Sequence, residues 1–373
     1  MSKIPFRFDH VGSLLRPERL KEARAAFKQG TITKEALTKI EDEAIIKVIQ
    51  KQKEIGLEAV TDGEFRRRWW HLDFIAGLNR ITVFDFETTA FGITTEAQGT
   101  FVSGKLSFNS QHPFLEHFKF TNEQAGKTLA KQTIPGPNMI YLDSFILSKQ
   151  YHEKPIYPNK EAFIKDLIGT YQAAIQAFYD AGCRYLQLDD TSWGGLFDER
   201  FRGLIVENGY DPDALIQEFG AITEAVLANK PADLAVTFHF CKGNFQSHWL
   251  YNGSYDKIAK CLLAIEGFNG FFLEFDDERS GSFEPLKNIH DQRIVLGLVT
   301  TKTPELEAKA ELKARIKEAT QFVPLDQLCL SPQCGFSSTH EGNKVTEEDQ
   351  WAKLKLVVET AKEVWPDLNL SPA

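Results

Sequence analysis

The sequence predicts an α/β protein built as a (β/α)8 TIM barrel, with a β-rich insertion between the second and third strands. The chain has 373 residues, a length that suits one large barrel. From about residue 130 onward, short β-rich apolar runs alternate with helical segments, as in βα units around a parallel sheet. No G-x-G-x-x-G pattern follows the first run, which counts against an open dinucleotide-binding sheet. A large open α/β sheet is the alternative.

Eight apolar runs are the predicted barrel strands. In chain order they cover residues 6–11, 57–61, 131–135, 184–188, 234–240, 270–275, 293–299 and 327–331. A long helical stretch that begins near Thr33 separates the first two runs, and shorter helical segments follow most of the others. Eight strands with helices between them favour the barrel over the open sheet.

The clearest helix is predicted over residues 160–181. Its apolar side chains recur at spacings of three and four, at Phe163, Leu167, Tyr171, Ala174 and Phe178. Asn159 suits the N-cap of this helix, and Gly182 suits its C-terminal stop.

The domain organisation follows from the same pattern. Residues 1–373 are predicted to form a single catalytic barrel domain. Residues 80–132 interrupt the βα rhythm with strand-like stretches separated by glycines, and we expect a hairpin-rich insertion there. The insertion is a candidate lid or a candidate contact in a homo-oligomer.

Composition excludes several classes of protein. The 52 acidic and 43 basic side chains give a formal net charge of −9. This balance does not indicate the excess of basic charge that binds nucleic acid or an anionic membrane. No apolar run reaches the roughly 18 residues of a membrane span, and the N-terminus lacks the apolar run of a signal peptide. The 5 cysteines are odd in number and scattered, as in a reducing compartment. We therefore expect a cytoplasmic protein.

Reactive side chains gather where the predicted strands end, the place where barrel enzymes carry their active sites. The second run leads into Asp62 and Glu64, the fourth into Asp189 and Asp190, the fifth into His239 and Cys241, the sixth into Glu274, and the eighth into Cys334. Interior barrel positions usually carry branched aliphatic residues, so these polar groups point to a site.

Four of these residues form a candidate zinc site: His239, Cys241, Glu274 and Cys334. Two thiolates, an imidazole and a carboxylate suit tetrahedral zinc. Residues i and i+2 of a strand face the same side, so His239 and Cys241 can reach one ion. Ligands from three strands at a barrel mouth favour a catalytic centre, where zinc would turn an incoming thiol into a nucleophilic thiolate. The alternative is that Glu274 and Cys334 are unrelated loop residues.

The remaining cysteines and carboxylates are expected to have different roles. Cys183, Cys261 and Cys329 are expected in the core. Buried carboxylates are costly unless paired, so Glu64 and Asp189 beside a zinc–thiolate site suit the ammonium group of a substrate. For Asp62 and Asp190 two roles are equally open: binding of the same ammonium group, or a local role as helix caps or acceptors for backbone amides.

Taken together, the motifs resemble the cobalamin-independent methionine synthases, and within them the short bacterial paralogues that match only the C-terminal catalytic half. The matching stretches are D-H-V-G-S-L at 9–14, D-G-E at 62–64, L-Q-L-D-D at 186–190, H-F-C at 239–241, L-E-F at 273–275 and S-P-Q-C-G-F at 331–336. They cover nearly the whole chain in the right order, which makes the resemblance specific.

The resemblance implies a TIM barrel whose zinc is held by His239, Cys241, Glu274 and Cys334. It also implies a homocysteine site made by Val11, Gly12, Ser13, Glu64 and Asp189, with the two carboxylates on the ammonium group. The implied reaction is transfer of a methyl group to the zinc-bound homocysteine thiolate, which gives methionine.

Two features depart from the family pattern. Full-length members carry a second, N-terminal barrel that helps to hold the folate polyglutamate, and this chain has none. After the seventh strand the family has a histidine proposed to protonate the leaving folate, and Lys302 or a threonine stands at that place here. We predict Lys302 as a catalytic acid, although an ammonium is not equivalent to an imidazole. Both departures put the methyl donor in doubt.

The sequence thus predicts a zinc-dependent S-methyltransferase with small-molecule partners: homocysteine or a similar thiol, and a methyl donor that is 5-methyltetrahydrofolate or another compound. The alternatives are alkyl transfer to a different thiol, or a non-catalytic barrel that binds zinc or an amino acid. Residues 66–71 (R-R-R-W-W-H) either meet the donor or form a solvated basic loop with tryptophans over the rim.

Overall fold

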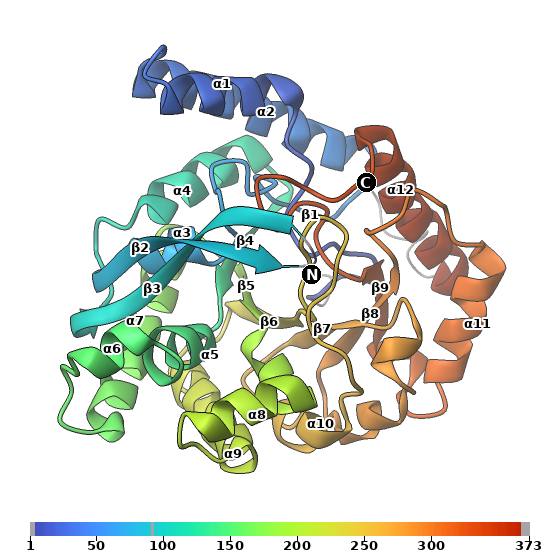
Figure 1. The fold of residues 1–373 in the computed structure, drawn as a ribbon. Helices are drawn as coiled ribbons and strands as arrows, with labels where there is room; N and C mark the ends of the chain where they lie inside the picture. Colours follow the sequence, from blue (N-terminus) through green and yellow to red (C-terminus); the bar gives the residue numbers. More distant parts are fainter. Residues whose placement is uncertain (1–3, 91–92, 367–373) are drawn as a thin grey trace.

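A computed structural model describes residues 4–90 and 93–366. Its centre is a curled parallel sheet of seven strands in the order β1-β4-β5-β6-β7-β8-β9, with helices around it (Figure 1). The strands are β1 (Ala59–Val60), β4 (Leu129–Pro135), β5 (Tyr185–Asp190), β6 (Ala235–Phe240), β7 (Gly270–Glu274), β8 (Arg293–Val299) and β9 (Leu328–Pro332). Each overlaps one of the predicted runs from the second to the eighth.

The first predicted run, residues 6–11, is wrong as a full strand. It makes one parallel bridge, from Phe8 to Leu330 of β9. The carbonyl groups of residues 10–12 accept hydrogen bonds from side chains instead of a neighbouring strand: His10 O from Lys131 Nζ at 2.6 Å, Val11 O from Gln187 Nε2 at 2.7 Å and Gly12 O from Thr61 Oγ1 at 2.7 Å. These side chains satisfy the backbone acceptors, so the ladder stops.

The same segment connects the two edges of the sheet. Phe8 lies beside β9, and the amide of Leu14 donates to Gly63 O, just after β1, at 3.0 Å. The carboxyl ends of the strands therefore face a common mouth that also receives residues 11–14.

Twelve α-helices are assigned among the described residues, most of them between successive strands. They are α1 (Glu18–Lys28), α2 (Lys34–Glu54), α3 (Leu72–Ala76), α4 (Pro113–Ala125), α5 (Pro137–Met139), α6 (Lys149–Glu153), α7 (Lys160–Asp180), α8 (Glu199–Glu207), α9 (Pro212–Leu227), α10 (Asp256–Leu262), α11 (Lys309–Ala319) and α12 (Glu347–Val364). One π-helix, η1 (Ile140–Ile146), and four 3-10 turns, η2 (Ser192–Leu196), η3 (Glu278–Ser280), η4 (Glu284–Asn288) and η5 (Leu325–Gln327), complete the described elements.

Helix α7 confirms the clearest helical prediction. The Asn159 side chain caps it by accepting from Ala162 N at 2.9 Å, and the five predicted apolar side chains are all buried. Burial of that stripe fixes α7 against the sheet, since each large apolar side chain contributes about 1.5–3 kcal/mol when removed from water.

A long antiparallel hairpin, β2 (Asn79–Ala90) with β3 (Ile93–Ser107), crosses in front of the sheet (Figure 1). It occupies the first half of residues 80–132, where the sequence predicts an insertion, whereas α4 and the start of β4 occupy the second half. Pro113 at the first turn and His112, whose ring accepts from Phe114 N, begin α4.

Most of the core is one large apolar cluster between sheet and helices, and two small buried clusters of described residues are separate from it. Cys183 and Cys329 are buried as expected, and Cys261 is half-buried. None of the described helices is long and apolar enough to cross a membrane.

Candidate metal centre and substrate pocket

The four predicted zinc ligands come together at the carboxyl ends of β6, β7 and β9. His239 lies in β6, and Cys241 and Glu274 each stand one position beyond the Phe240–Leu273 register pair. Cys334 follows β9 by two residues. One ligand atom from each residue lies within 4.8 Å of the others, and all four residues are buried.

The donor atoms fit a metal ion. The Sγ atoms of Cys241 and Cys334 are 3.4 Å apart as free thiols. Hydrogen bonding from Cys241, aided by the neighbouring His239, holds the pKa of Cys334 well below its usual range, which favours a thiolate. On His239, Nδ1 lies 2.9 Å from Asp189 Oδ1, whereas Nε2 is buried without a hydrogen-bond partner. An imidazole held in this way presents its free nitrogen as a metal ligand.

Glu274 is held by groups that surround the cluster. Its Oε1 accepts from the Lys242 amide at 2.7 Å, and its Oε2 accepts from Arg279 Nη2 at 2.8 Å. Glu274 is fully buried, and these contacts offset the cost of burying its charge. The carboxylate is thereby fixed beside the two thiols.

A small pocket of about 40 Å³ joins this cluster to the predicted substrate residues. Val11, Ser13, Glu64 and Asp189 line it together with His239, Cys241 and Cys334. Gly12 lies directly behind Glu64: a Cβ atom added there would be 2.8 Å from Thr133 Cγ2 and 3.5 Å from Glu64 Oε1. Gly12 also has a φ of 143°, which side-chain-bearing residues rarely adopt.

Glu64 is aimed into the pocket from a strained backbone, with a φ of 62°. Its Oε1 accepts from Thr133 Oγ1 at 2.8 Å and lies 3.3 Å from Arg67 Nη1, while Oε2 is buried without a partner. Burial raises the pKa of Glu64 to about 7, against the lowering effect of Arg67. A cationic group that enters the pocket would therefore stabilise the ionised form.

Asp189 is built into the metal centre more closely than the sequence indicates. Its Oδ1 accepts a hydrogen bond from Gln187 Nε2 at 2.7 Å and lies 2.9 Å from His239 Nδ1. Gln187 also binds Val11 O, so one amide group connects the first-strand segment with Asp189. The Asp189 carboxylate therefore orients the His239 ring, whether or not it also binds a substrate ammonium group.

Asp62 and Asp190 act on the backbone. Asp62 Oδ1 accepts from the Glu64 amide at 2.8 Å, and Asp190 Oδ1 accepts from the Ser192 amide at 2.7 Å. This confirms the interpretation of both residues as acceptors for backbone amides.

Lys302 lies beside Glu274 and not in the lining of the pocket. Its Nζ is 3.9 Å from both Glu274 Oε2 and Asp276 Oδ2, and its side chain is buried. A role as catalytic acid therefore stays a prediction.

Sequence reasoning missed four residues of the pocket lining, Thr191, Gly243, Asn244 and Ser338, and Trp70 lines the pocket as well. Asn244 Nδ2 donates to Gly335 O at 2.7 Å, and its Oδ1 is buried without a partner. Trp70 belongs to the 66–71 run, for which the sequence leaves two roles open. Arg66 of that run pairs with Glu41 and Asp42 on α2, so this arginine is structural.

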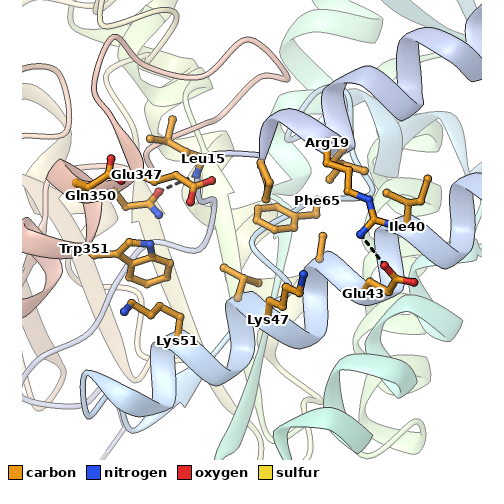
Figure 2. A pocket seen from close by; sticks show the side chains of 15 residues that line it. Leu15, Arg19, Ile40, Glu43, Lys47, Lys51, Phe65, Glu347, Gln350 and Trp351 are labelled. Atoms are coloured by element: carbon orange, nitrogen blue, oxygen red, sulfur yellow. Dashed lines mark hydrogen bonds and ion pairs between the residues drawn. The ribbon is translucent and has the colours of Figure 1, made fainter.

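A larger cavity of about 670 Å³ lies elsewhere, between α2, the segment before α1 and the start of α12 (Figure 2). Leu15, Phe65 and Trp351 give it apolar walls, and the ion pair between Arg19 and Glu43 stands at its rim. Its lining residues include no thiol or imidazole of the kind found at the strand ends. The size of a cavity therefore does not identify the reactive site.

Comparison with known proteins agrees with this architecture. The family model "Cobalamin-independent synthase, Catalytic domain" matches residues 9–363. The uncharacterized protein YxjH of Bacillus subtilis is 49% identical over 367 residues, covering 97% of this chain and 96% of its own. A Listeria monocytogenes crystal structure, provisionally identified as a vitamin-B12 independent methionine synthase, has a TM-score of 0.78 at 41% identity and covers 98% of this chain and 99% of its own.

A more distant neighbour shares the fold. The B12-independent methionine synthase from Shewanella sp. W3-18-1, solved in complex with selenomethionine, has a TM-score of 0.73 at 18% identity, covering 98% of this chain and 99% of its own. The family model and the structural neighbours indicate a methionine-synthase-like methyltransferase. The chain belongs to the cobalamin-independent methionine synthase catalytic-domain family.

Proposed function

We propose that the protein is a zinc-dependent methyltransferase that moves a methyl group to the thiol of homocysteine and forms methionine. The observation that carries the proposal is the shared pocket: four buried ligand atoms within 4.8 Å stand beside Glu64, whose Oε2 has no partner. The Shewanella relative, a methionine synthase solved with selenomethionine, supports an amino acid of this shape as ligand.

His239, Cys241, Glu274 and Cys334 would hold the zinc. When bound, the zinc supplies Lewis acidity that lowers the pKa of a substrate thiol and keeps it as a thiolate near neutral pH. Asp189 keeps the His239 ring in one orientation, and Arg279 with the Lys242 amide fixes Glu274. Such supporting contacts raise metal affinity and prevent the ligands from turning away.

The substrate's amino group is assigned to the two carboxylates, Glu64 and Asp189, which line the same pocket. An ammonium bound there places the side-chain thiol toward the thiols of the cluster. Val11, Gly12 and Ser13 complete this binding site from the first-strand segment. Orientation of the thiol before the methyl group arrives lowers the entropic part of the barrier.

The same proposal includes the complete fold. Residues 6–14 connect β9 with the loop after β1. We assign this segment to the place of the remaining strand in a (β/α)8 barrel, although it forms only one bridge with the described strands. The hairpin β2–β3 would be the insertion of a single catalytic domain, residues 1–373. For a folate donor, Lys302 would be the proton source for the leaving group.

A methionine-formation assay tests the function. Zinc-loaded protein receives homocysteine and, in separate reactions, 5-methyltetrahydrofolate as mono- and polyglutamate, methylcobalamin or S-methylmethionine, and methionine is measured by mass spectrometry. Methionine formation from any donor supports the proposal. Metal-loaded, folded protein that forms no methionine with the whole panel contradicts it.

A further inference from the structure

A third pocket, of about 250 Å³, lies between the hairpin β2–β3, helix α3 and the π-helix η1. None of its residues belongs to the metal cluster or to the substrate residues described above. The π-helix follows β4 and α5, so the pocket lies at the same carboxyl end of the sheet as the metal centre. Isolated π-helical turns are often retained for function.

Aromatic rings form one wall of this pocket. Phe84 and Phe86 lie on β2 with ring centroids 5.7 Å apart. Phe84 packs over Gly99, where an added Cβ atom would lie 2.5 Å from Phe84 Cζ, and Phe86 is 43% exposed. His71 also lines the pocket, and burial lowers its pKa to about 3, so the ring is neutral at pH 7.

Asp143 of η1 is the acidic residue in the pocket lining. Its side chain is exposed, and no described residue donates a hydrogen bond to it or forms an ion pair with it. A carboxylate without a cation, facing aromatic and aliphatic walls, is complementary to an organic cation.

The pocket adjoins the candidate active site. The rings of His71 and Trp70 are 4.6 Å apart, and Trp70 lines the pocket of the metal centre. The hairpin is tied to η1 by a hydrogen bond of 2.7 Å between the buried hydroxyls of Thr100 and Ser144. Asp143 is also close enough to act electrostatically on Asp190, the neighbour of Asp189.

We propose that this pocket is the subsite for the methyl donor, and that the donor carries a methylated onium cation, either a sulfonium or a quaternary ammonium. The inference rests on the proposed function, because a methyltransferase site needs a place for its donor beside the acceptor. Asp143 binds the charge, and Phe84 and Phe86 bind the methyl-bearing group through their faces.

The chemistry balances for a sulfonium donor. The acceptor sulfur forms a bond to the methyl carbon while the bond from that carbon to the sulfonium sulfur breaks, and its electron pair returns to the sulfonium sulfur. A thiolate and a sulfonium thus give two neutral thioethers, and the proton lost from the acceptor thiol goes to water. The leaving group needs no acid, which agrees with Lys302 lying against Glu274 and Asp276.

Calorimetry on the zinc-loaded full chain tests the subsite without turnover. The probes are trimethylsulfonium and tetramethylammonium, with tert-butanol as a neutral molecule of similar shape. We expect both cations to bind more tightly than tert-butanol, and Asp143→Asn to weaken cation binding by about tenfold or more. Phe86→Leu, at an exposed ring, should weaken it by about threefold. Glu87→Gln removes an equal charge from the same hairpin outside the pocket and should leave binding unchanged.

Equal binding of tert-butanol and the cations, or unchanged cation binding in folded Asp143→Asn, would overturn the subsite. A second assay measures methionine formed from S-methyl-L-methionine and from glycine betaine, which separates sulfonium from ammonium donors. Loss of that turnover in Asp143→Asn supports the inference. Methionine formed only from methyltetrahydrofolate overturns the cationic donor and leaves the proposed function standing.

Discussion

The metal cluster and the pocket under the hairpin are built in different ways. The four ligands stand on neighbouring parallel strands or directly after them, so sheet register brings their donor atoms within 4.8 Å. The pocket under the hairpin is made by the hairpin itself, a short helix and a π-helix, which are not parts of the seven-stranded sheet. In the proposed function the rigid strand ends would hold the metal and the acceptor thiol, and the added segments would determine which donor can approach. Four substitutions test these separate roles of the strand ends and the donor side.

The largest effect is expected from Cys334→Ala. Loss of one thiolate leaves three donors, and we expect zinc affinity to fall more than about 100-fold, measured by competition with a chromogenic chelator. Cys261→Ala is the matched control, since this half-buried thiol bonds to Ile216 O and should not affect zinc. Full zinc content in purified Cys334→Ala would remove the ligand assignment.

Asp189→Asn should come next. An asparagine carries no negative charge, so it orients the His239 ring and supports its basicity less well than the Asp189 carboxylate does. Zinc affinity should therefore decrease about 10- to 100-fold, and homocysteine affinity should decrease as well. Chelator competition and calorimetry measure the two effects separately. If both affinities equal those of the wild type, Asp189 neither orients His239 nor binds the ammonium group.

Glu64→Gln tests the acceptor side alone. The pKa of Glu64 is about 7, so its carboxyl group gains charge as the pH rises through that value. The affinity of zinc-loaded protein for methionine, whose ammonium stays protonated, should therefore rise between about pH 6 and about pH 8. In Glu64→Gln we expect about tenfold weaker binding and no such rise. A persistent rise in the variant would assign it to another group.

The smallest effect is expected from Lys302→Met when the donor is a sulfonium. The leaving thioether needs no proton, so methionine formation should decrease less than about threefold. With a folate donor the same variant should lose at least about 100-fold, because protonation of the leaving nitrogen then matters. Equal large losses with both donors would give Lys302 a general structural role beside Glu274.

Most of the sheet and the reactive cluster could be predicted from the sequence. Parallel strands have recognisable apolar runs, and residues at their carboxyl ends meet at one mouth, so His239, Cys241, Glu274 and Cys334 could be grouped from their positions alone. Successive side chains of a strand point to opposite faces, and this alternation is a local property that can be read from the sequence.

The errors and omissions have long-range causes. Residues 6–11 have a strand-like composition, but the carbonyl groups of residues 10–12 are taken by Lys131, Gln187 and Thr61, partners up to 176 residues away. The contact of Asp189 with His239 depends on the register between β5 and β6, which sequence spacing does not contain. Asp143 could not be predicted as a pocket residue because the sequence does not indicate that the hairpin folds against η1.

The metal centre is proposed above all to bind and activate a substrate thiol. Zinc-edge X-ray absorption on the zinc-loaded protein, before and after addition of homocysteine, tests this role most directly. We expect two sulfur neighbours from Cys241 and Cys334 before addition and a third sulfur at about 2.3 Å afterwards. An unchanged sulfur coordination at saturating homocysteine would contradict thiol activation at this centre.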